Sequence, residues 1–238
     1  MWFITVKPLR RVISFGGSTI YNSEDDNINV PYCSAFIELL KENPEERYLI
    51  VVGGGKTARQ YINAAGEYEI DEEGQDLLGI EASHLNALLF ALLLNKAGIR
   101  TYHSKKIFDD YQGFLEQYDV IVTGGTIPGH TTDKVAVQCA AKYGDRELVK
   151  VTSVGGIYDD DPAKNESATL IRMIKASELI KVWGTEHTPG SNKPIGVKTV
   201  EEALEKNVKV HIVGEDIGDL RRALFEREGY RGTLIIPE

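Results

Sequence analysis

The chain has 238 residues, of which 42% are apolar and 26% are charged, and its formal net charge is −9. Such a chain is ordinary for a globular protein and long enough to bury a core without disulfides or metals. The negative charge argues against a general nucleic-acid binder, whose surface would be basic. Cys33 and Cys139 lie far apart with no paired spacing, which indicates neither a disulfide framework nor a zinc site.

The apolar segments are too short for a membrane protein. The longest uninterrupted apolar run, residues 87–94, is far below the roughly 20 residues that span a bilayer. Residues 1–11 do not have the signal-peptide layout of a basic start, an apolar stretch and a small-residue cleavage site. We therefore expect a cytoplasmic protein with no membrane partner.

Short β-branched runs alternate with longer helical stretches along the chain. The first strand is predicted at residues 12–15, and a helix follows at 31–41. A strand at 48–52 runs into a helix that begins near Thr57, and residues 80–97 are apolar almost all round, as in a buried helix. Further strands are predicted near residues 98–102, 120–123, 148–153, 208–213 and 233–236.

Strands separated by helices in this way favour parallel pairing with right-handed crossovers. The sequence contains no internal repeat, low-complexity tract or linker. We therefore predict one α/β domain over residues 1–238. Its mainly parallel central sheet would be covered by helices on both faces, as a three-layer α/β/α sandwich. In such sheets, ligands bind beyond the carboxyl ends of the strands, where loops lead into helices.

Glycine-rich loops follow the first two predicted strands. Residues 16–19 read Gly-Gly-Ser-Thr, and residues 53–56 read Gly-Gly-Gly-Lys. Glycine lets the backbone approach a bulky anion, and the free N–H groups at the start of the next helix favour a phosphate or carboxylate. A tight turn that binds nothing is the alternative, since short glycine motifs have low specificity. The first loop lacks the Lys-Ser/Thr pair of a P-loop.

The third loop, residues 124–133, reads Gly-Gly-Thr-Ile-Pro-Gly-His-Thr-Thr-Asp. Its last three residues, Thr131, Thr132 and Asp133, are good caps for the helix that follows. The Pro-Gly pair upstream shapes a loop broad enough to hold a ligand above the helix start. His130 has no second His or Cys at ligand spacing, so we expect no metal there.

The fourth loop, residues 152–161, ends in three aspartates before a proline. These carboxylates can hold a divalent cation or form a solvated turn, and Tyr158 can flank a flat ring or pack as an ordinary aromatic residue. Four such loops at one sheet edge favour a phosphate site. Two phosphorylated groups brought together repel by about 4 kcal/mol per unit pair at 4 Å and a dielectric of 20, so cations are needed. The candidates are Lys56, Arg59, Lys164 and a Mg²⁺ ion carried by a nucleotide.

Together, the motifs resemble the amino-acid-kinase superfamily, and within it the archaeal type of uridylate (UMP) kinase. The most specific of them is the block at residues 124–133. The others keep the family's order and spacing from about residue 12 to residue 238; they are residues 16–18, 51–59, 76–80, 85–89, 134–136 and 156–162. The resemblance implies an amino-acid-kinase fold, with the acceptor bound by the N-terminal part and ATP by the C-terminal part.

The resemblance also implies a reaction, in which the γ-phosphoryl group of ATP passes to UMP to give ADP and UDP. Lys164 matches a lysine that approaches the transferred phosphoryl group, and with Arg59 and Lys56 it is expected to be catalytic. ATP, with its Mg²⁺, would contact Gly16, Gly17, Ser18, Gly55, Arg59, Thr152, Ser153, Tyr158 and Asp161. UMP would contact Gly54, Asp76, Thr126, Ile127, Pro128, Gly129, His130, Thr131 and Thr132. The family further implies pyrimidine nucleotide biosynthesis and assembly as a hexamer.

The chain departs from the family at several positions. Many members carry a lysine at the position of Ser14, and the family's Thr-Asn-Val-Asp-Gly loop here has Ser153 and Gly155 in place of the amide and the acid. His84 stands where arginine is usual, and residues 188–197 replace a Ser-rich segment. The alternatives are therefore a non-catalytic nucleotide sensor or oxyanion (molybdate-type) store, or a kinase for another small phosphorylated acceptor.

Overall fold

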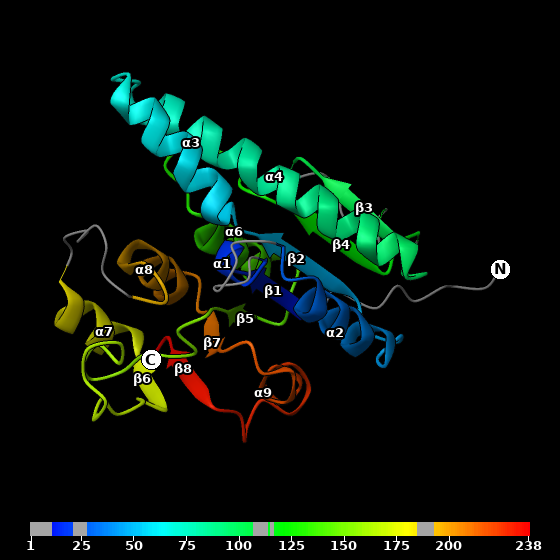
Figure 1. The fold of residues 1–238 in the computed structure, drawn as a ribbon. Coiled ribbons are helices and arrows are strands. Elements are labelled where there is room, and N and C mark those ends of the chain that lie inside the picture. Colours follow the sequence, from blue (N-terminus) through cyan, green and yellow to red (C-terminus); the bar gives the residue numbers. More distant parts are fainter. Residues whose placement is uncertain (1–10, 21–27, 107–113, 115–116, 185–192) are drawn as a thin grey trace.

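Eight strands form one sheet through the centre of the molecule (Figure 1). In chain order they are β1 (Arg11–Phe15), β2 (Tyr48–Val52), β3 (Thr101–Ser104), β4 (Val120–Thr123), β5 (Glu147–Val151), β6 (Met173–Lys175), β7 (Lys209–Val213) and β8 (Gly232–Ile236). Across the sheet their order is β3-β4-β2-β1-β5-β7-β8-β6; among these strands of the described residues, β7 and β8 pair antiparallel and the other neighbours pair parallel. This computed structural model describes residues 11–20, 28–106, 114, 117–184 and 193–238.

Helices cover both faces of the sheet. They are α1 (Gly17–Ile20), α2 (Val30–Lys41), α3 (Gly55–Glu67), α4 (Glu72–Lys96), α6 (Thr132–Lys142), α7 (Ala176–Trp183), α8 (Val197–Glu205) and α9 (Ile217–Arg221), with a π-helical turn η1 (Arg222–Glu226). Apolar residues of α2, α4 and α9 pack in a core on one face, and those of α6, α7 and α8 pack in a second core on the other. The predicted three-layer α/β/α sandwich with a mainly parallel sheet is confirmed.

The pleat of the strands decides which core each side chain joins. Successive side chains of a strand point to opposite faces. Ile13 and Phe15 therefore join the core under α2 and α4, whereas Val12 joins the core under α6. Phe15 stacks on Phe90 of α4, with their ring centroids 5.1 Å apart. This contact fixes α4 over β1, close to the carboxyl ends of the central strands.

The elements that differ from the prediction include α4, β6 and β3. Helix α4 begins at Glu72, eight residues before the predicted start, because its first two turns are polar and half-exposed and give no buried stripe to detect. With α3 it forms a hairpin that extends beyond the sheet (Figure 1). Strand β6 was not predicted, because it has three residues and none is buried. Strand β3 begins at Thr101, somewhat later than predicted.

Helix α4 is long and apolar enough to cross a membrane by length and composition. It is instead a core helix of this fold, since Ala87, Phe90 and Leu94 on its inner side are buried against the sheet. Elsewhere in the described ranges, no other helix passes the same test.

Glu147, at the amino end of β5, lies among cationic and imidazole groups. Its Oε2 atom is 2.8 Å from Nη1 of Arg227 and 3.4 Å from Nε2 of the buried His211. The interaction with the nearby His211 imidazole, and after it the charge of Arg227, lowers the pKa of Glu147 to about 2. The folded protein therefore binds a proton at this carboxylate less readily than the unfolded chain does.

We expect Glu147→Gln to lower the free energy of unfolding at pH 7 by on the order of 1–2 kcal/mol, less than the full linkage equivalent of this pKa shift because solvent partly screens the carboxylate. A depressed folded-state pKa stabilises the protein above the unfolded value near 4.5, and that stabilisation is lost as the pH falls towards 2. Urea unfolding of both proteins at pH 7, 4 and 3 measures the difference. A difference that stays constant over this range would contradict the assignment.

Candidate functional site

The glycine loops after β1 and β2 touch each other through their backbones. Gly16 N–H donates to Val151 O over 3.2 Å, and Gly53 N–H donates to Phe15 O over 3.0 Å. A side chain at Gly17 would overlap the backbone of Gly55. Gly55 itself has φ +60°, a left-handed conformation that favours glycine, and it begins α3. The glycines thus allow a close approach of two loops and two helix starts at one sheet edge.

Helix α4 supports these loops from one side. The buried Asn86 side chain donates to Gly53 O at 2.9 Å and to Gly54 O at 3.1 Å. The Ser83 hydroxyl accepts a hydrogen bond from Gly125 N–H over 2.7 Å and donates to Ile80 O. These two polar side chains position two loops at once. Asn86 belongs to a motif of the resemblance, but neither residue is among the predicted site residues.

A pocket of about 210 Å³ lies beside the third loop. It is lined by Asp76, Gly79, Ile80, Gly125, His130, Thr131 and Thr132. Across it, Gly129 N–H donates to Asp76 Oδ2 over 2.6 Å, which ties the loop to α4. The hydroxyl of Thr131 accepts from Lys134 N–H and caps α6, and burial lowers the pKa of His130. The pocket therefore combines a carboxylate, hydroxyls and the N-terminus of an eleven-residue helix.

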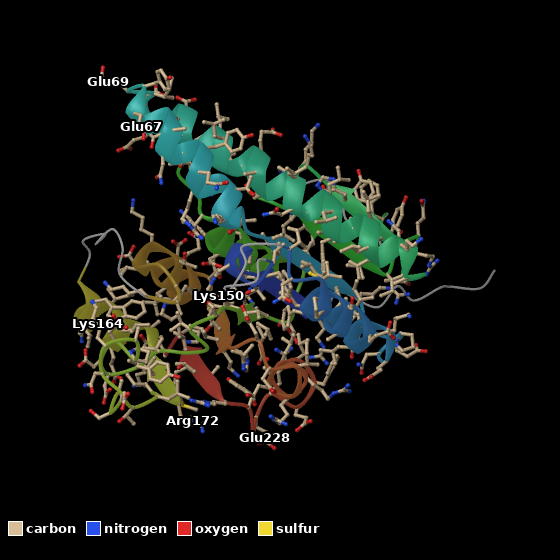
Figure 2. All side chains as sticks on the ribbon, in the orientation of Figure 1. Glu67, Glu69, Lys150, Lys164, Arg172 and Glu228 are labelled. Atoms are coloured by element: carbon tan, nitrogen blue, oxygen red, sulfur yellow. The ribbon has the colours of Figure 1, made fainter. Side chains whose placement is uncertain are left out.

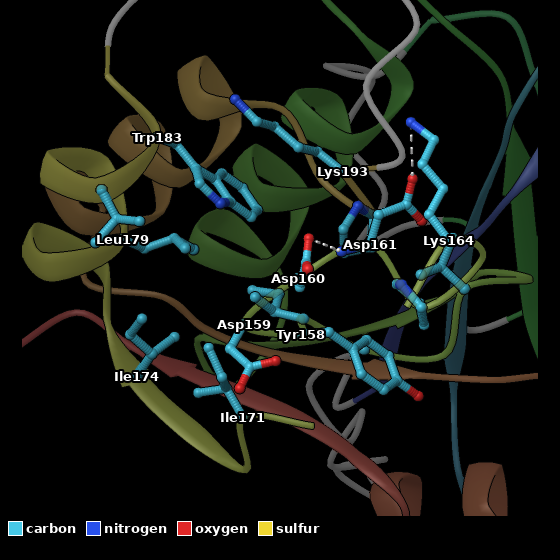
Figure 3. A pocket seen from close by; sticks show the side chains of 16 residues that line it. Tyr158, Asp159, Asp160, Asp161, Lys164, Ile171, Ile174, Leu179, Trp183 and Lys193 are labelled. Carbon is cyan, nitrogen blue, oxygen red and sulfur yellow. Dashed lines mark hydrogen bonds and ion pairs between the residues drawn. The ribbon is translucent and has the colours of Figure 1, made fainter. Parts of the chain in front are cut away.

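A larger pocket of about 490 Å³ lies over α7 and the segment after β5 (Figure 3). One wall is apolar and includes Ile171, Leu179 and Trp183. The opposite wall carries Tyr158 and the aspartate run, and Lys164 Nζ is 3.4 Å from Asp161 Oδ2. An apolar wall beside an aromatic ring and polar groups suits a flat heterocycle joined to a charged tail.

The strand order separates these pockets. The smaller pocket is lined by the loop after β4 and by α4, and the larger one by the segment after β5, by β6 and by α7. The loop after the central strand β1 lies between these two halves of the sheet edge. Two separate ligands can therefore bind along one edge, with the glycine loops between them.

The structure brings only part of the predicted site residues into the pockets. Asp76, His130, Thr131 and Thr132 line the smaller pocket, and Tyr158, Asp161 and Lys164 line the larger one. The other predicted residues line neither and lie on the glycine loops, the first turns of α1 and α3, and the loops after β4 and β5; they are Gly16, Gly17, Ser18, Gly54, Gly55, Lys56, Arg59, Thr126, Ile127, Pro128, Gly129, Thr152 and Ser153. Of the altered segment 188–197, residues 188–192 lie outside the described part.

One ion pair near the loops, between a buried lysine and a partly buried aspartate, was missed by the sequence prediction. Asp133 Oδ1 accepts hydrogen bonds from the Ser14 hydroxyl and from Lys150 Nζ, each over 2.6 Å. Asp133 was predicted as a helix cap, and Lys150 as an ordinary strand residue. The available signal was a lysine in the otherwise apolar run of residues 148–151. Within the described ranges, no three His, Cys, Asp or Glu side chains gather to hold a metal ion.

Gly155, where the family motif carries an acid, has φ +75°. A side chain there would meet Gly214 at 3.5 Å, an ordinary contact distance, so the conformation and not the available space favours glycine. Glycine at this position therefore suits the backbone conformation of the loop after β5.

Known proteins with a similar sequence and fold include uridylate kinases. The uridylate kinase of Pyrococcus abyssi is 34% identical over 234 residues, which make up 96% of this chain and 100% of that one. That of Thermoplasma volcanium is 34% identical over 214 residues, covering 90% and 92%. The crystal structure of uridylate kinase from Archaeoglobus fulgidus matches with a TM-score of 0.73 and 26% identity, covering 94% of this chain and 99% of that one.

The amino acid kinase family model matches residues 10–214, which include both glycine loops, the third and fourth loops and the Lys150–Asp133 pair. The fold, the near-full-length relatives and this match all indicate the same family. The chain belongs to the amino acid kinase family.

Proposed function

We propose that the protein transfers the γ-phosphoryl group of ATP to UMP and releases ADP and UDP. The observation that carries this proposal is the pair of pockets on opposite sides of the glycine loops at one sheet edge. The near-full-length similarity to archaeal uridylate kinases supports the same reaction. The smaller pocket would take UMP, and the larger one the adenosine part of ATP.

Positioning and charge neutralisation would supply the catalysis. UMP is mostly a dianion at neutral pH, because the second pKa of a phosphate monoester is about 6, so its oxygen needs no general base. Backbone N–H groups of the loop that begins at Gly16, and of the start of α3, would hold the phosphates in line. Mg²⁺ would enter with ATP, held by phosphate oxygens, and would neutralise charge on them. Lys56 and Arg59, on the first turns of α3, would face the same phosphates.

A coupled assay of ADP release, with Mg²⁺, ATP and each nucleoside monophosphate in turn, tests this function. We expect turnover with UMP to exceed that with AMP, CMP or GMP by on the order of tenfold or more, because the pocket's polar groups would be left unpaired by the wrong base. ATP without an acceptor serves as the control. If the protein binds ATP but releases no ADP in the presence of UMP, it is a nucleotide sensor or oxyanion store and not a kinase.

We further propose that the protein acts in the cytoplasm, in pyrimidine nucleotide biosynthesis. We also propose that it forms a homo-oligomer, with the hexamer as its complete assembly. On the outer side of α4, Leu77, Leu85, Leu88 and Leu92 are all more than 40% exposed and recur at helical spacing. Exposed apolar residues gathered on one helix face often mark a protein–protein contact, which supports burial against a second copy. Light scattering gives the mass, and a monomer at micromolar concentration would refute the assembly.

A further inference from the structure

Strand β5 carries a lysine in the middle of the sheet. Lys150 is 5% exposed, and its strand neighbours Val149 and Val151 are completely or almost completely buried. Strand β5 lies between β1 and β7, so Lys150 is on an interior strand of the sheet and not on an edge strand. Removing an ammonium group from water costs several kcal/mol, even when it is paired. An apolar residue would fill this position at no such cost, which points to a use for the charge.

The pleat and the strand register determine where this charge lies. Leu148 joins the core under α6, so Lys150, two residues later, lies on the same face. Its register partner on β1 is Ser14, and both side chains donate to Asp133 Oδ1 in the first turn of α6. Figure 2 shows Lys150 in the middle of the molecule, whereas Lys164 lies near its edge.

The ammonium group has more donors than acceptors. Lysine carries three N–H donors, and the described residues give Lys150 Nζ one acceptor, Asp133 Oδ1. The Lys150 side chain is 7% exposed, so bulk water does little to satisfy the others. A buried donor without a partner is costly, and phosphate oxygens are strong acceptors for it.

The Lys150–Asp133 pair lies next to the loops that are proposed to face the phosphates. Gly16 N–H bonds to the carbonyl of Val151, the residue directly after Lys150. Asp133 follows Thr131 and Thr132, which line the smaller pocket. The lysine therefore lies where the loop after β1 meets the start of α6, between the halves of the sheet edge assigned to the two nucleotides.

We propose that Lys150 is a catalytic residue whose ammonium group contacts the phosphoryl group in transit, a role that rests on the proposed kinase reaction. In that reaction a UMP phosphate oxygen forms a bond to the γ-phosphorus of ATP. The bond from that phosphorus to the β–γ bridging oxygen breaks, and ADP leaves with the electron pair. Lys150 transfers no proton; it neutralises the charge spread over the equatorial oxygens, and Asp133 is the positioning residue that holds it.

Burial makes this cation more effective than the exposed candidates. Lys164 has an 83% exposed side chain, so water and salt screen its charge. Lys150 is fixed in a site with a low dielectric, where a preorganised charge acts on the transition state without reorganisation. A purely stabilising role explains the presence of Lys150 less well than a catalytic role does, because buried ion pairs are on average no better for stability than apolar replacements.

The test measures kcat, both KM values and the thermal midpoint for wild type, Lys150→Met and Lys150→Arg. We expect Lys150→Met to lower kcat about 100-fold or more, as removal of one preorganised charge-stabilising donor does, with KM values close to wild type. Lys150→Arg, which keeps the charge, should recover part of the loss. The control is Lys209→Met, whose 52% exposed side chain lies at the opposite, amino end of β7 and should leave kcat unchanged.

A folded Lys150→Met protein with a kcat within about threefold of wild type would overturn the proposal while leaving the kinase function intact. A wild-type protein that forms no UDP would overturn both. If Lys150→Met does not fold, Asp133→Asn/Lys150→Met removes both charges and leaves neither unpaired. Near-wild-type turnover by that double variant would also refute the role of Lys150, and a loss of about 100-fold would support it.

Discussion

Gly17→Ala is expected to lower the rate of UDP formation by on the order of 100-fold and to destabilise the fold. An added methyl group would overlap the backbone N and Cα of Gly55 and lie 2.9 Å from the carbonyl carbon of Gly53. Backbone atoms cannot move aside like the end of a flexible side chain, so the two loops must separate. Overpacking of this kind costs about 1–3 kcal/mol of stability. A displacement of about 1 Å at a phosphoryl-transfer site costs on the order of 100-fold in rate.

Urea unfolding and the coupled UMP assay measure both effects. The matched control is Gly66→Ala near the end of α3, where an added methyl group meets nothing within 4 Å and the φ angle is negative. Alanine in a helix interior is more stable than glycine by about 0.5–1 kcal/mol, so this variant should gain stability and keep its activity. A fully active Gly17→Ala enzyme would show that the contact of the two loops does not position the phosphates.

The loops could be predicted from the sequence because their chemistry is local. A glycine run between a β-branched run and a helix marks a strand–loop–helix turn wherever the strand lies. Parallel pairing then places all such loops at the same sheet edge, and residues such as Asp76 and Tyr158 fall into pockets along that edge. The fold class and the strand positions follow from the same regularity. The division into an acceptor half and an ATP half came from the family resemblance and stays a prediction.

Contacts between distant residues could not be predicted in this way. The sequence shows that Ser14 replaces a lysine common in the family, but it does not show that Lys150, 136 positions later, is the register partner of Ser14 on the next strand. Nor does it show that Asn86 reaches back to two carbonyls of the second glycine loop. These arrangements depend on the order of strands and the rotation of α4, which tertiary packing decides.

The length of α4, and with it the α3–α4 hairpin, was underestimated for a related reason. Amphipathic periodicity marks a helix by the face that it buries, and the first turns of α4 bury little within one copy of the chain. The Asp71 side chain accepts from Gly74 N–H and caps the helix there, which is a local signal. The hydrogen bond of Asp76 to Gly129 shows what this extension does: it brings a carboxylate over the loop that begins at Gly124.

Asp76→Ala is expected to raise the KM for UMP by about 10- to 100-fold, with a KM for ATP close to wild type. The carboxylate has two oxygens; Oδ2 accepts from Gly129 N–H, and Oδ1 can accept from a ribose hydroxyl of UMP. A hydrogen bond to a charged group contributes about 1.5–3 kcal/mol, and both bonds belong to the acceptor side. Initial rates at varied UMP and saturating ATP, and the converse, separate the two constants.

Asp76→Asn and Glu73→Gln sharpen this test. Asparagine keeps the size of the side chain and one acceptor but loses the charge, so its KM for UMP should lie between those of wild type and Asp76→Ala. Glu73 is exposed one turn earlier on α4, and its neutral variant should match wild type. Equal increases in both KM values would mean that Asp76 orders the whole site. An increase for ATP alone would place the acceptor on the other side of the glycine loops.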